Sequence, residues 1–553
     1  MPLSLTIKLS LVALAIVLFL AVQSGDLISY YFFRSFDGFA VLGLVSLWAL
    51  VGWVRPAATM PGKPPLRAAI VLVAVLLVVL LWAGTHAIML NYPLSRDEHM
   101  VVFDAAIYRE GRLFERLPQE WYGFAEALAP AFLLETPDMS LLVSGYLPLN
   151  AVLRGLVGSL LAPELTGPLL VASGFLALAW IARHLFEDTP RAQWVALAAY
   201  CLSAQVLAMG MTTYAMSAHL TANLIWLALF LKDRWWSHAL AMIVGVAAMG
   251  LHQFLFHPLF AVPLVLLLAW QRRWLAFGAY AGVYGLGVLF WMSYGGIVVA
   301  AAGLETGAGG AAGVLGFVED RVLPLLLALD PLALQLMLLN LVRALAWNAA
   351  FLLPFLIGAW SLARGGKRQD PFVLALFAGI VLTLAAMFVL LPMQGHGWGY
   401  RYLHGLLGSC ALLAGFGYRE WSRAADEQGR RRIDGALVGL GAVGALVMVP
   451  AALWSAHTFI APHAALHDII LQQEADFVIV DDDRWQNAVD ETRNRPDLSN
   501  SPLVFARRKL TAGQIAELCR RGTVAVIGER HMVEADMIGV PQDGVRPLDN
   551  PCG

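Results

Sequence analysis

The chain has 553 residues, of which 59% are hydrophobic and only 14% are charged. Because soluble domains carry about 25% charged residues, this composition predicts a membrane protein. The net charge of −2 comes with neither a basic tail nor an RNA-binding aromatic motif, so we expect no nucleic-acid partner. Four cysteines are too few for a disulfide scaffold. Cys519 and Cys552 share the polar C-terminal region, and they could pair in an oxidising compartment.

Apolar runs of about 20 residues are long enough to cross a bilayer. We predict about thirteen such helices, at residues 7–23, 37–54, 68–91, 165–185, 191–210, 217–231, 237–252, 256–270, 274–298, 340–363, 371–392, 401–418 and 434–456. The first run could also be a signal peptide, but its positive region is thin and its cleavage site is poor, which favours a retained anchor.

Alternate loops between these runs are basic, and cytoplasmic loops are enriched in Lys and Arg. The basic loops are at 55–67, 183–191, 232–234, 272–273, 364–368 and 419–432. They predict a multi-pass protein of a bacterial inner membrane, with the N-terminus cytoplasmic and the C-terminus periplasmic. We divide the chain into an N-terminal hairpin (1–67), a transmembrane domain (68–456) with a large outer loop at 92–164, and a periplasmic domain (457–553).

Three outer regions do not cross the membrane. In the first loop, the amphipathic stretch 103–117 is expected to lie along the interface. Residues 303–316 are rich in Gly and Ala and predict a mobile loop, followed by an apolar helix around 324–339 on or in the membrane. In the tail, 477–480 and 524–527 predict strands and 511–521 an amphipathic helix capped by Thr511. The fold class is therefore an all-α polytopic membrane protein with a small α/β periplasmic domain.

An acid pair, Asp97 and Glu98, opens the large outer loop, and Asp104 follows about two helical turns later. The ordinary interpretation of such a pair is a solvated helix end. The alternative is catalytic, because a carboxylate at this membrane surface could deprotonate an acceptor hydroxyl or amine. We therefore treat Asp97 and Glu98 as candidate catalytic residues and Asp104 as a candidate substrate contact.

A second cluster lies before a late helix, where Arg401 follows Gly395, Gly397 and Gly399. A guanidinium matches phosphate oxygens at two points, so we expect Arg401 to bind a phosphate rather than to act as an interfacial anchor. The aromatic and histidine side chains around it are read either as belt residues or as contacts to a sugar or phosphate. They are His396, Trp398, Tyr400 and Tyr402.

Two histidines, His252 and His257, stand five residues apart between apolar runs. Helical metal pairs prefer a spacing of three or four, so a zinc site is not expected. A polar lining of an acceptor or lipid-phosphate channel is our interpretation, because buried polar groups in membranes are usually functional. The triplet Asp481 to Asp483 ends a predicted strand, and a solvated strand end is favoured there over a metal site.

These motifs together resemble the C-type membrane glycosyltransferases, in the bacterial branch related to protein O-mannosyltransferases and lipid A aminoarabinose transferases. The resemblance rests on Asp97-Glu98 opening the first outer loop, on Arg401-Tyr402-Leu403 entering a late helix, and on the proline-containing segment 146–156. It covers residues 68–420, without the first two helices and the tail. It implies inverting transfer from a polyprenyl-phosphate sugar, with Asp97 as general base.

The sequence departs from this family at the next outer loop. His219 stands where the family usually has a second acid, so the acid-dependent metal binding of the family is not expected here. His219 could orient the acceptor or donate to a phosphate, and a hydrogen-bonded helix-end histidine is the equal alternative. We assign no metal ligands and no cofactor, and a divalent cation stays an open alternative.

The predicted function is transfer of a sugar from a polyprenyl-phosphate donor to a lipid, glycan or protein acceptor on the periplasmic face. A transporter or lipid-linked glycan flippase is the alternative, with Asp97, His252 and Arg401 lining a pathway. Transporters usually bury their charges near the middle of the membrane at broken helices. Most candidates here lie at the outer rim, which favours an enzyme. A polytopic scaffold with an outward sensor tail is a weaker third interpretation.

Overall fold

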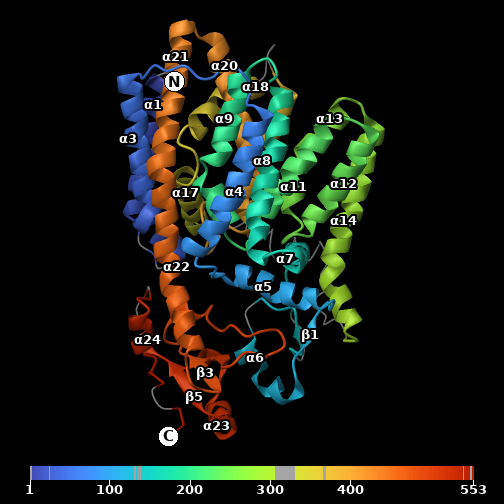
Figure 1. Cartoon of the computed structure of the whole chain (residues 1–553), viewed down its shortest axis with the longest axis vertical. Helices are drawn as coiled ribbons and strands as arrows, with labels where there is room; N and C mark the ends of the chain where they lie inside the picture. Colours follow the sequence, from blue (N-terminus) through green and yellow to red (C-terminus); the bar gives the residue numbers. More distant parts are fainter. Residues whose placement is uncertain are drawn as a thin grey trace.

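The computed structural model describes residues 3–304, 331–364 and 369–552, apart from positions 24, 26, 130–131, 135, 137–138, 538, 540, 543 and 549–550. Most of the predicted Gly/Ala-rich loop at 303–316, and the start of the predicted apolar helix at 324–330, lie outside the described residues. The described chain forms a helical bundle with a smaller unit beneath it, and the two chain ends lie at opposite ends of the molecule (Figure 1).

Six helical stretches among the described residues are long and apolar enough to cross a membrane. They are Ile28–Val54 (α2, η1 and α3), Arg67–Ala87 (α4), Pro163–Leu185 (η3 and α8), Trp274–Ala301 (α14), Pro371–Leu390 (α19) and Glu427–Leu471 (α21, η7 and α22). The pair α9 (Pro190–Cys201) and α10 (Ala204–Gly210) is bent by 52° and makes a seventh if it is one span.

Shorter helices complete the bundle. They are α1 (Leu3–Ala21), α11 (Met216–Leu231), α12 (Trp235–Met249), α13 (Phe256–Trp270), α17 (Pro331–Ala346), α18 (Leu352–Ala363) and α20 (Leu407–Ala424). The predicted fold class, an all-α polytopic membrane protein, is confirmed, whereas the count of thirteen spans is not.

The predicted span at 340–363 is wrong, because α17 ends at Ala346 and α18 begins only at Leu352. Polar side chains in the break bond to other helices. Asn348 Nδ2 donates to Gln205 Oε1 at 3.1 Å, and Asn348 Oδ1 accepts from Ser203 Oγ at 2.7 Å. The hydropathy of this segment predicts one continuous span, because it contains few polar residues.

The predicted cytoplasmic loops, apart from residues 365–368 outside the described chain, lie together at the end of the bundle that carries the N-terminus (Figure 1). Ala58 N donates to Arg431 O at 3.1 Å, and Arg183 Nη2 donates to Pro65 O at 2.7 Å. These bonds join three of the basic loops directly. The alternation of basic and neutral loops therefore matches the two ends of the bundle, and which end is cytoplasmic stays a prediction.

Helices α5 (Arg96–Arg109) and α7 (Leu149–Leu160) lie across the other end of the bundle, above the C-terminal unit (Figure 1). A capping box starts α5, because Glu98 N donates to Ser95 Oγ and Ser95 N donates to Glu98 Oε2, each at 3.3 Å. The helix ends at Arg109, and β1 (Glu115–Arg116) then pairs antiparallel with β2 (Leu141–Leu142). The predicted bounds of the amphipathic stretch, 103–117, are therefore wrong.

The C-terminal unit is a parallel three-stranded sheet in the order β4-β3-β5, with two helices. Its elements are β3 (Phe477–Val480), β4 (Leu503–Ala506), α23 (Ala512–Arg521), β5 (Val524–Ile527) and α24 (Glu529–Glu534). The predicted strands at 477–480 and 524–527 and the Thr511 cap are confirmed, and Cys519 is bonded to Cys552. Strand β4 was not predicted, because only four apolar residues follow a polar, proline-containing stretch.

Two features of this part of the chain, the end of α22 and the burial of Asp481 and Asp482, differ from the prediction. Helix α22 (Val449–Leu471) continues well past the predicted end at 456, because its buried side chains pack on the C-terminal unit. Asp481 and Asp482 are not a solvated strand end, since each is 1% exposed. Asp481 pairs with Arg507 at 2.6 Å and Asp482 with Arg508 at 2.9 Å.

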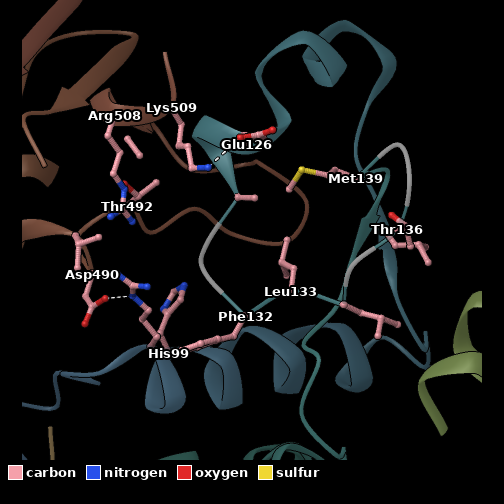
Figure 2. A pocket seen from close by; sticks show the side chains of 16 residues that line it. His99, Glu126, Phe132, Leu133, Thr136, Met139, Asp490, Thr492, Arg508 and Lys509 are labelled. Carbon is pink, nitrogen blue, oxygen red and sulfur yellow. Dashed lines mark hydrogen bonds and ion pairs between the residues drawn. The ribbon is translucent and has the colours of Figure 1, made fainter. Parts of the chain in front are cut away.

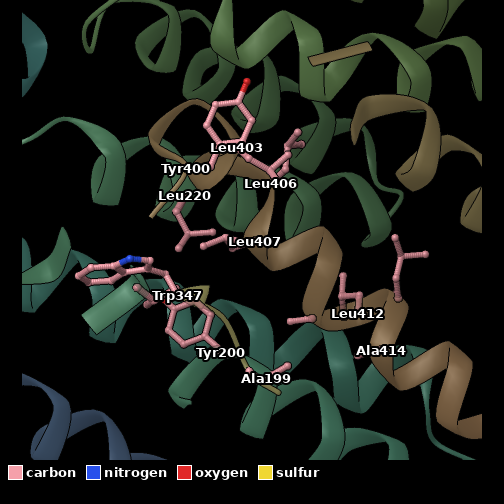
Figure 3. Packing of buried hydrophobic residues seen from close by; sticks show 14 of the residues in the cluster. Ala199, Tyr200, Leu220, Trp347, Tyr400, Leu403, Leu406, Leu407, Leu412 and Ala414 are labelled. Atoms are coloured by element: carbon pink, nitrogen blue, oxygen red, sulfur yellow. The ribbon is translucent and has the colours of Figure 1, made fainter. Parts of the chain in front are cut away.

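The main hydrophobic core lies inside the bundle, where η6 (Arg401–Leu406) and α20 pack against α9 and α11. Figure 3 shows Leu407 beside Leu220 within this core. This packing fixes the start of η6, and therefore Arg401, at the end of the bundle nearest α5.

Candidate active site

Asp97 on α5 and Arg401 on η6 form an ion pair where the bundle meets the first outer loop. Arg401 Nη1 lies 2.7 Å from Asp97 Oδ2, and the two side chains are 6% and 17% exposed. The guanidinium also lies over the ring of Tyr214, with Cζ 4.8 Å from the ring centroid. The two motifs predicted to face the same side of the membrane thus meet directly.

The glycines before Arg401 permit its position. Gly397 and Gly399 have φ values of +132° and +67°, which side-chain-bearing residues rarely adopt. A Cβ on Gly397 would lie 2.3 Å from Arg401 Cδ, and one on Gly399 would lie 2.3 Å from Gln205 Oε1. Gln394 completes the support, because its Oε1 accepts from Arg401 N at 2.9 Å and its backbone oxygen accepts from Arg401 Nη2.

Tyr146 and His252 form the other side of this site. Tyr146 Oη donates to Asp97 Oδ1 at 2.5 Å, and the Tyr146 ring lies 4.3 Å from the His252 ring, centroid to centroid. Sequence reasoning placed Tyr146 in the segment that carries the family resemblance but gave it no role. The carboxylate of Asp97 therefore receives hydrogen bonds at both oxygens.

The charges around Asp97 keep it ionised. Burial alone would raise the pKa of Asp97, but the Arg401 guanidinium, then His252 and the Tyr146 hydroxyl, lower it to about 2. Burial lowers the pKa of His252 to about 4, so this imidazole is neutral at neutral pH. Burial likewise lowers the pKa of His396 to about 4. The site thus contains one buried carboxylate and one buried guanidinium that neutralise each other.

Glu98 points away from this pair. Its Oε1 accepts from Thr213 N and its Oε2 from Ser95 N, both at 3.3 Å, and Thr213 Oγ1 donates to Glu98 O at 3.0 Å. Glu98 is 2% exposed, and burial raises its pKa to about 7. These bonds link the start of α5 to the next outer loop, which is a structural arrangement, and the predicted catalytic role of Glu98 stays untested.

Asp104 is also buried, at 3% exposure, and its Oδ1 accepts from Ser144 N at 3.0 Å. Burial raises the pKa of Asp104 to about 7. The side chain therefore connects the segment after β2 to α5. Its predicted contact with a substrate is not tested by this placement.

His219, in the first turn of α11, is 2% exposed, and neither ring nitrogen has a hydrogen-bond partner. It lines a cavity of about 10 Å³ together with Asn223, Phe256, Arg401 and Tyr402. A cavity of this size holds about one water molecule. His219 thus lies beside Arg401, although neither of its ring nitrogens makes a hydrogen bond there.

The remaining predicted residues are spread more widely. His257 bonds to Asn223 Oδ1 at 2.8 Å and to Tyr284 Oη at 2.9 Å within the bundle, apart from His252. Trp398 is 0% exposed and packs among Phe32, Trp347 and Phe459; Tyr400 is also 0% exposed. Tyr402 stays near the site, with Arg401 Cζ 5.7 Å from its ring centroid.

Sequence reasoning missed the segment 490–494, which connects the C-terminal unit to the start of α5. Arg493 donates to Pro93 O at 2.6 Å and to Leu94 O at 3.0 Å, and Glu491 accepts from Tyr92 Oη at 2.7 Å. Glu491 is 0% exposed and also meets His463 Nδ1 at 3.2 Å. A buried Glu and Arg in a loop had no local pattern that could reveal these contacts.

No group of three or more His, Cys, Asp or Glu residues that could hold a metal ion occurs within the described ranges. The donors at Asp97 are Arg401 and Tyr146, which are hydrogen-bond donors rather than metal ligands. Within the described part of the site, Asp97 is therefore held by an ion pair at one oxygen and a hydrogen bond at the other.

Taken with the helices, this geometry defines a polytopic membrane protein with a buried acid–arginine pair at the rim of its bundle. No protein-family model matches the chain, and no curated protein matches it in sequence. Among solved structures, ArnT from Cupriavidus metallidurans bound to undecaprenyl phosphate is similar at 12% identity and a TM-score of 0.48, over 86% of this chain and 89% of that one.

The apo state of the same ArnT is similar at 13% identity and a TM-score of 0.45, over 85% of this chain and 87% of that one. At these identities and TM-scores, the similarity assigns neither a reaction nor any residue role to this chain.

Proposed function

We propose that this protein is an inverting glycosyltransferase that moves a sugar from a polyprenyl-phosphate donor to an acceptor at the periplasmic face. The observation that carries the proposal is the Asp97–Arg401 pair, with its 2.7 Å contact at the rim of the bundle. A carboxylate can serve as general base, and a guanidinium can hold a phosphate at two points. This reaction needs both groups within reach of one substrate.

In the resting pair, Arg401 holds the Asp97 carboxylate and makes it a weak base, with a pKa of about 2. A donor phosphate carries the same kind of oxygens and can replace the carboxylate at the guanidinium. Asp97 then loses the charge that lowers its pKa and becomes a stronger base. Donor binding would thus activate the base, and the Tyr146 hydroxyl would continue to orient it.

The proposed transfer joins the acceptor oxygen to the anomeric carbon and releases the polyprenyl phosphate. Asp97 takes the proton from an acceptor hydroxyl as the acceptor oxygen bonds to the anomeric carbon. The bond between that carbon and the phosphate oxygen breaks, and the polyprenyl phosphate leaves with the electron pair. Arg401 stabilises the charge that develops on the leaving phosphate. Attack from the face opposite the leaving group inverts the anomeric configuration.

The surroundings suit a lipid-linked donor. Helix α7 lies across the bundle end beside α5, and it exposes Leu156 and Leu160 at 58% and 84%. Exposed leucines on a helix at a membrane surface favour contact with acyl or polyprenyl chains. A donor held by its chain in the bilayer could therefore place its phosphate near α5.

The proposal is tested with the purified protein in membranes, using donor prepared from a strain that lacks the gene. Extracts of that strain should lack one sugar on an envelope lipid, glycan or protein, and added protein should restore it only when the polyprenyl-phosphate sugar is present. A complete set of envelope sugars in the deletion strain would contradict the proposal.

A transporter or flippase stays the second candidate, because one charged pair does lie inside the bundle. Arg343 Nε lies 2.8 Å from Asp37 Oδ2, and both side chains are 3% exposed. Trp347 Nε1 also donates to Asp37 Oδ1 at 2.8 Å. If this pair lines a pathway, Asp37→Asn with Arg343→Gln would stop movement of a lipid-linked glycan across vesicles. On this alternative the unaltered protein would move the glycan without transferring any sugar.

A further inference from the structure

A cavity of about 450 Å³ lies on the far side of α5 from the bundle, between the first outer loop and the C-terminal unit. Figure 2 shows His99 rising from α5 on one side, Thr492 and Arg508 on another, and Glu126 and Phe132 from the outer loop. A cavity of this volume is in the range of small-molecule sites. The Asp97–Arg401 site does not use it.

Three polar atoms in the wall are buried and lack hydrogen-bond partners. They are His99 Nε2, Thr136 Oγ1 and Thr492 Oγ1, and the two threonines are 7% and 6% exposed. Buried polar groups in folded proteins are nearly always satisfied, so unsatisfied ones that line a cavity point to a ligand or water there. Burial, followed by the charges of Arg493 and His467, lowers the pKa of His99 to about 3. The neutral imidazole can therefore donate one hydrogen bond and accept another.

Each cation in the wall is paired with a carboxylate, and two of these carboxylates, Glu126 and Asp490, also line the cavity. Lys509 Nζ lies 3.0 Å from Glu126 Oε2, Arg96 pairs with Asp490, and Arg508 pairs with Asp482 at 2.9 Å. A phosphate entering the cavity would have to compete with these carboxylates. A neutral ligand with many hydroxyls would not, because hydroxyls can donate to the acids and accept from the cations.

The cavity adjoins the Asp97–Arg401 pair through Phe132 in its wall. The Phe132 ring lies 5.6 Å from the Tyr146 ring, whose hydroxyl donates to Asp97, and Arg96 Cζ lies 5.8 Å from the same Phe132 ring. Phe132 is 50% exposed and has a φ of +70°, a strained value for an aromatic residue. Asp490, also in the wall, has Oδ2 4.0 Å from His396 Nδ1.

We infer that this cavity binds an uncharged, hydroxyl-rich saccharide unit of the acceptor and that Phe132 separates it from the catalytic pair. His99 and the two threonines supply the unsatisfied hydrogen-bonding atoms, and the apolar part of the wall, including Ala129 and Met139, covers the faces of the sugar ring. The inference rests on the proposed function for the identity of the ligand as acceptor. It adds the chemical class of that ligand and its place.

The binding test uses full-length protein in lipid nanodiscs on an array of defined bacterial oligosaccharides, both neutral and phosphorylated. Binding to neutral oligosaccharides is expected. Thr492→Val removes one hydroxyl without changing the shape, and it should weaken that binding by about three- to tenfold. Ala129→Trp should abolish the binding by filling the cavity. Thr458→Val makes the same chemical change on the exposed side of α22, and it should leave the binding unchanged.

Equal binding by Thr492→Val, Ala129→Trp and the unaltered protein would overturn the inference. Binding that depends on the two positions but is confined to phosphorylated oligosaccharides would overturn its chemical class. The cavity inference and the proposed function can fail separately. Saccharide binding without any transfer by the unaltered protein would contradict the proposed function alone. Transfer with an acceptor KM that neither variant changes would contradict the cavity alone.

Discussion

Arg401 Nη1 contacts Asp97 Oδ2 at 2.7 Å, which joins two residues 304 positions apart in the sequence. Because both side chains are largely buried, each neutralises a charge that would otherwise be costly. A change at either residue therefore affects the other.

Asp97→Asn should lower the rate of transfer by about 10²–10⁴, the usual contribution of a general base. The amide oxygen of Asn still accepts from Arg401, so folding should be affected less than activity, and donor affinity should hold or rise. Single-turnover rates, donor affinity and the midpoint of thermal unfolding measure these effects. Asp468→Asn, at an exposed position on α22, is the matched control. Full turnover by Asp97→Asn would remove Asp97 from the mechanism.

Much of the bundle could be predicted from the sequence, because a long apolar run predicts a membrane helix without information from the rest of the chain. The two strands at 477–480 and 524–527 were predicted for the same local reason. Contacts between distant segments could not be predicted in this way. His252 and His257 are five residues apart, yet α13 begins between them at Phe256 and turns only His257 into the bundle. Arg401 was singled out by its motif and its predicted side of the membrane, but its pairing with Asp97 was not predicted, and Tyr146 had no signal of either kind.

Tyr146→Phe should shift the acidic limb of the pH–rate profile to higher pH. The hydroxyl donates to Asp97 Oδ1 and is one of the groups that lower the pKa of Asp97. Without it, that pKa rises, and the base becomes protonated at a higher pH as the solution is acidified. A hydrogen bond to a charged group contributes about 1.5–3 kcal/mol, so we expect a measurable loss of rate as well. Tyr122→Phe, on an exposed side chain, is the control; an unmoved limb would contradict the assigned bond.

Asp104→Asn should make stability less dependent on pH. Burial raises the pKa of Asp104 from 3.8 to about 7, so the folded protein binds a proton there that the unfolded chain has lost. Stability should therefore fall as pH rises from about 4 to about 7. Asn is neutral and keeps an oxygen for Ser144 N, so the variant should lose this decline. Thermal unfolding midpoints from pH 4 to pH 8 measure it, and parallel curves for the two proteins would contradict the raised pKa.

The unaltered protein should remain active in chelator, because His219 replaces the acid that the resembling family uses near a metal. His219→Asp should then introduce or strengthen a dependence on divalent ions, since hard cations prefer carboxylate oxygens over imidazole. The cavity beside Arg401 that His219 lines gives the new carboxylate a place near the site. Transfer rates with EDTA, and with added magnesium or manganese, decide the question. Inactivation of the unaltered protein by EDTA, reversed by either ion, would contradict this prediction.

Arg401→Lys should be damaged almost as severely as Arg401→Ala. The guanidinium reaches Asp97 with one nitrogen and Gln394 O with the other while it lies over Tyr214, and an ammonium cannot reproduce this planar geometry. If the same two-point grip holds the donor phosphate, both variants should weaken donor binding by about 1.5–3 kcal/mol. Donor affinity is measured for both variants and for Arg520→Lys, an exposed arginine on α23. If Arg401 is only an interfacial anchor, lysine should serve as well as arginine, and only alanine should reduce insertion or stability. An unchanged donor affinity for Arg401→Lys would therefore exclude the phosphate clamp.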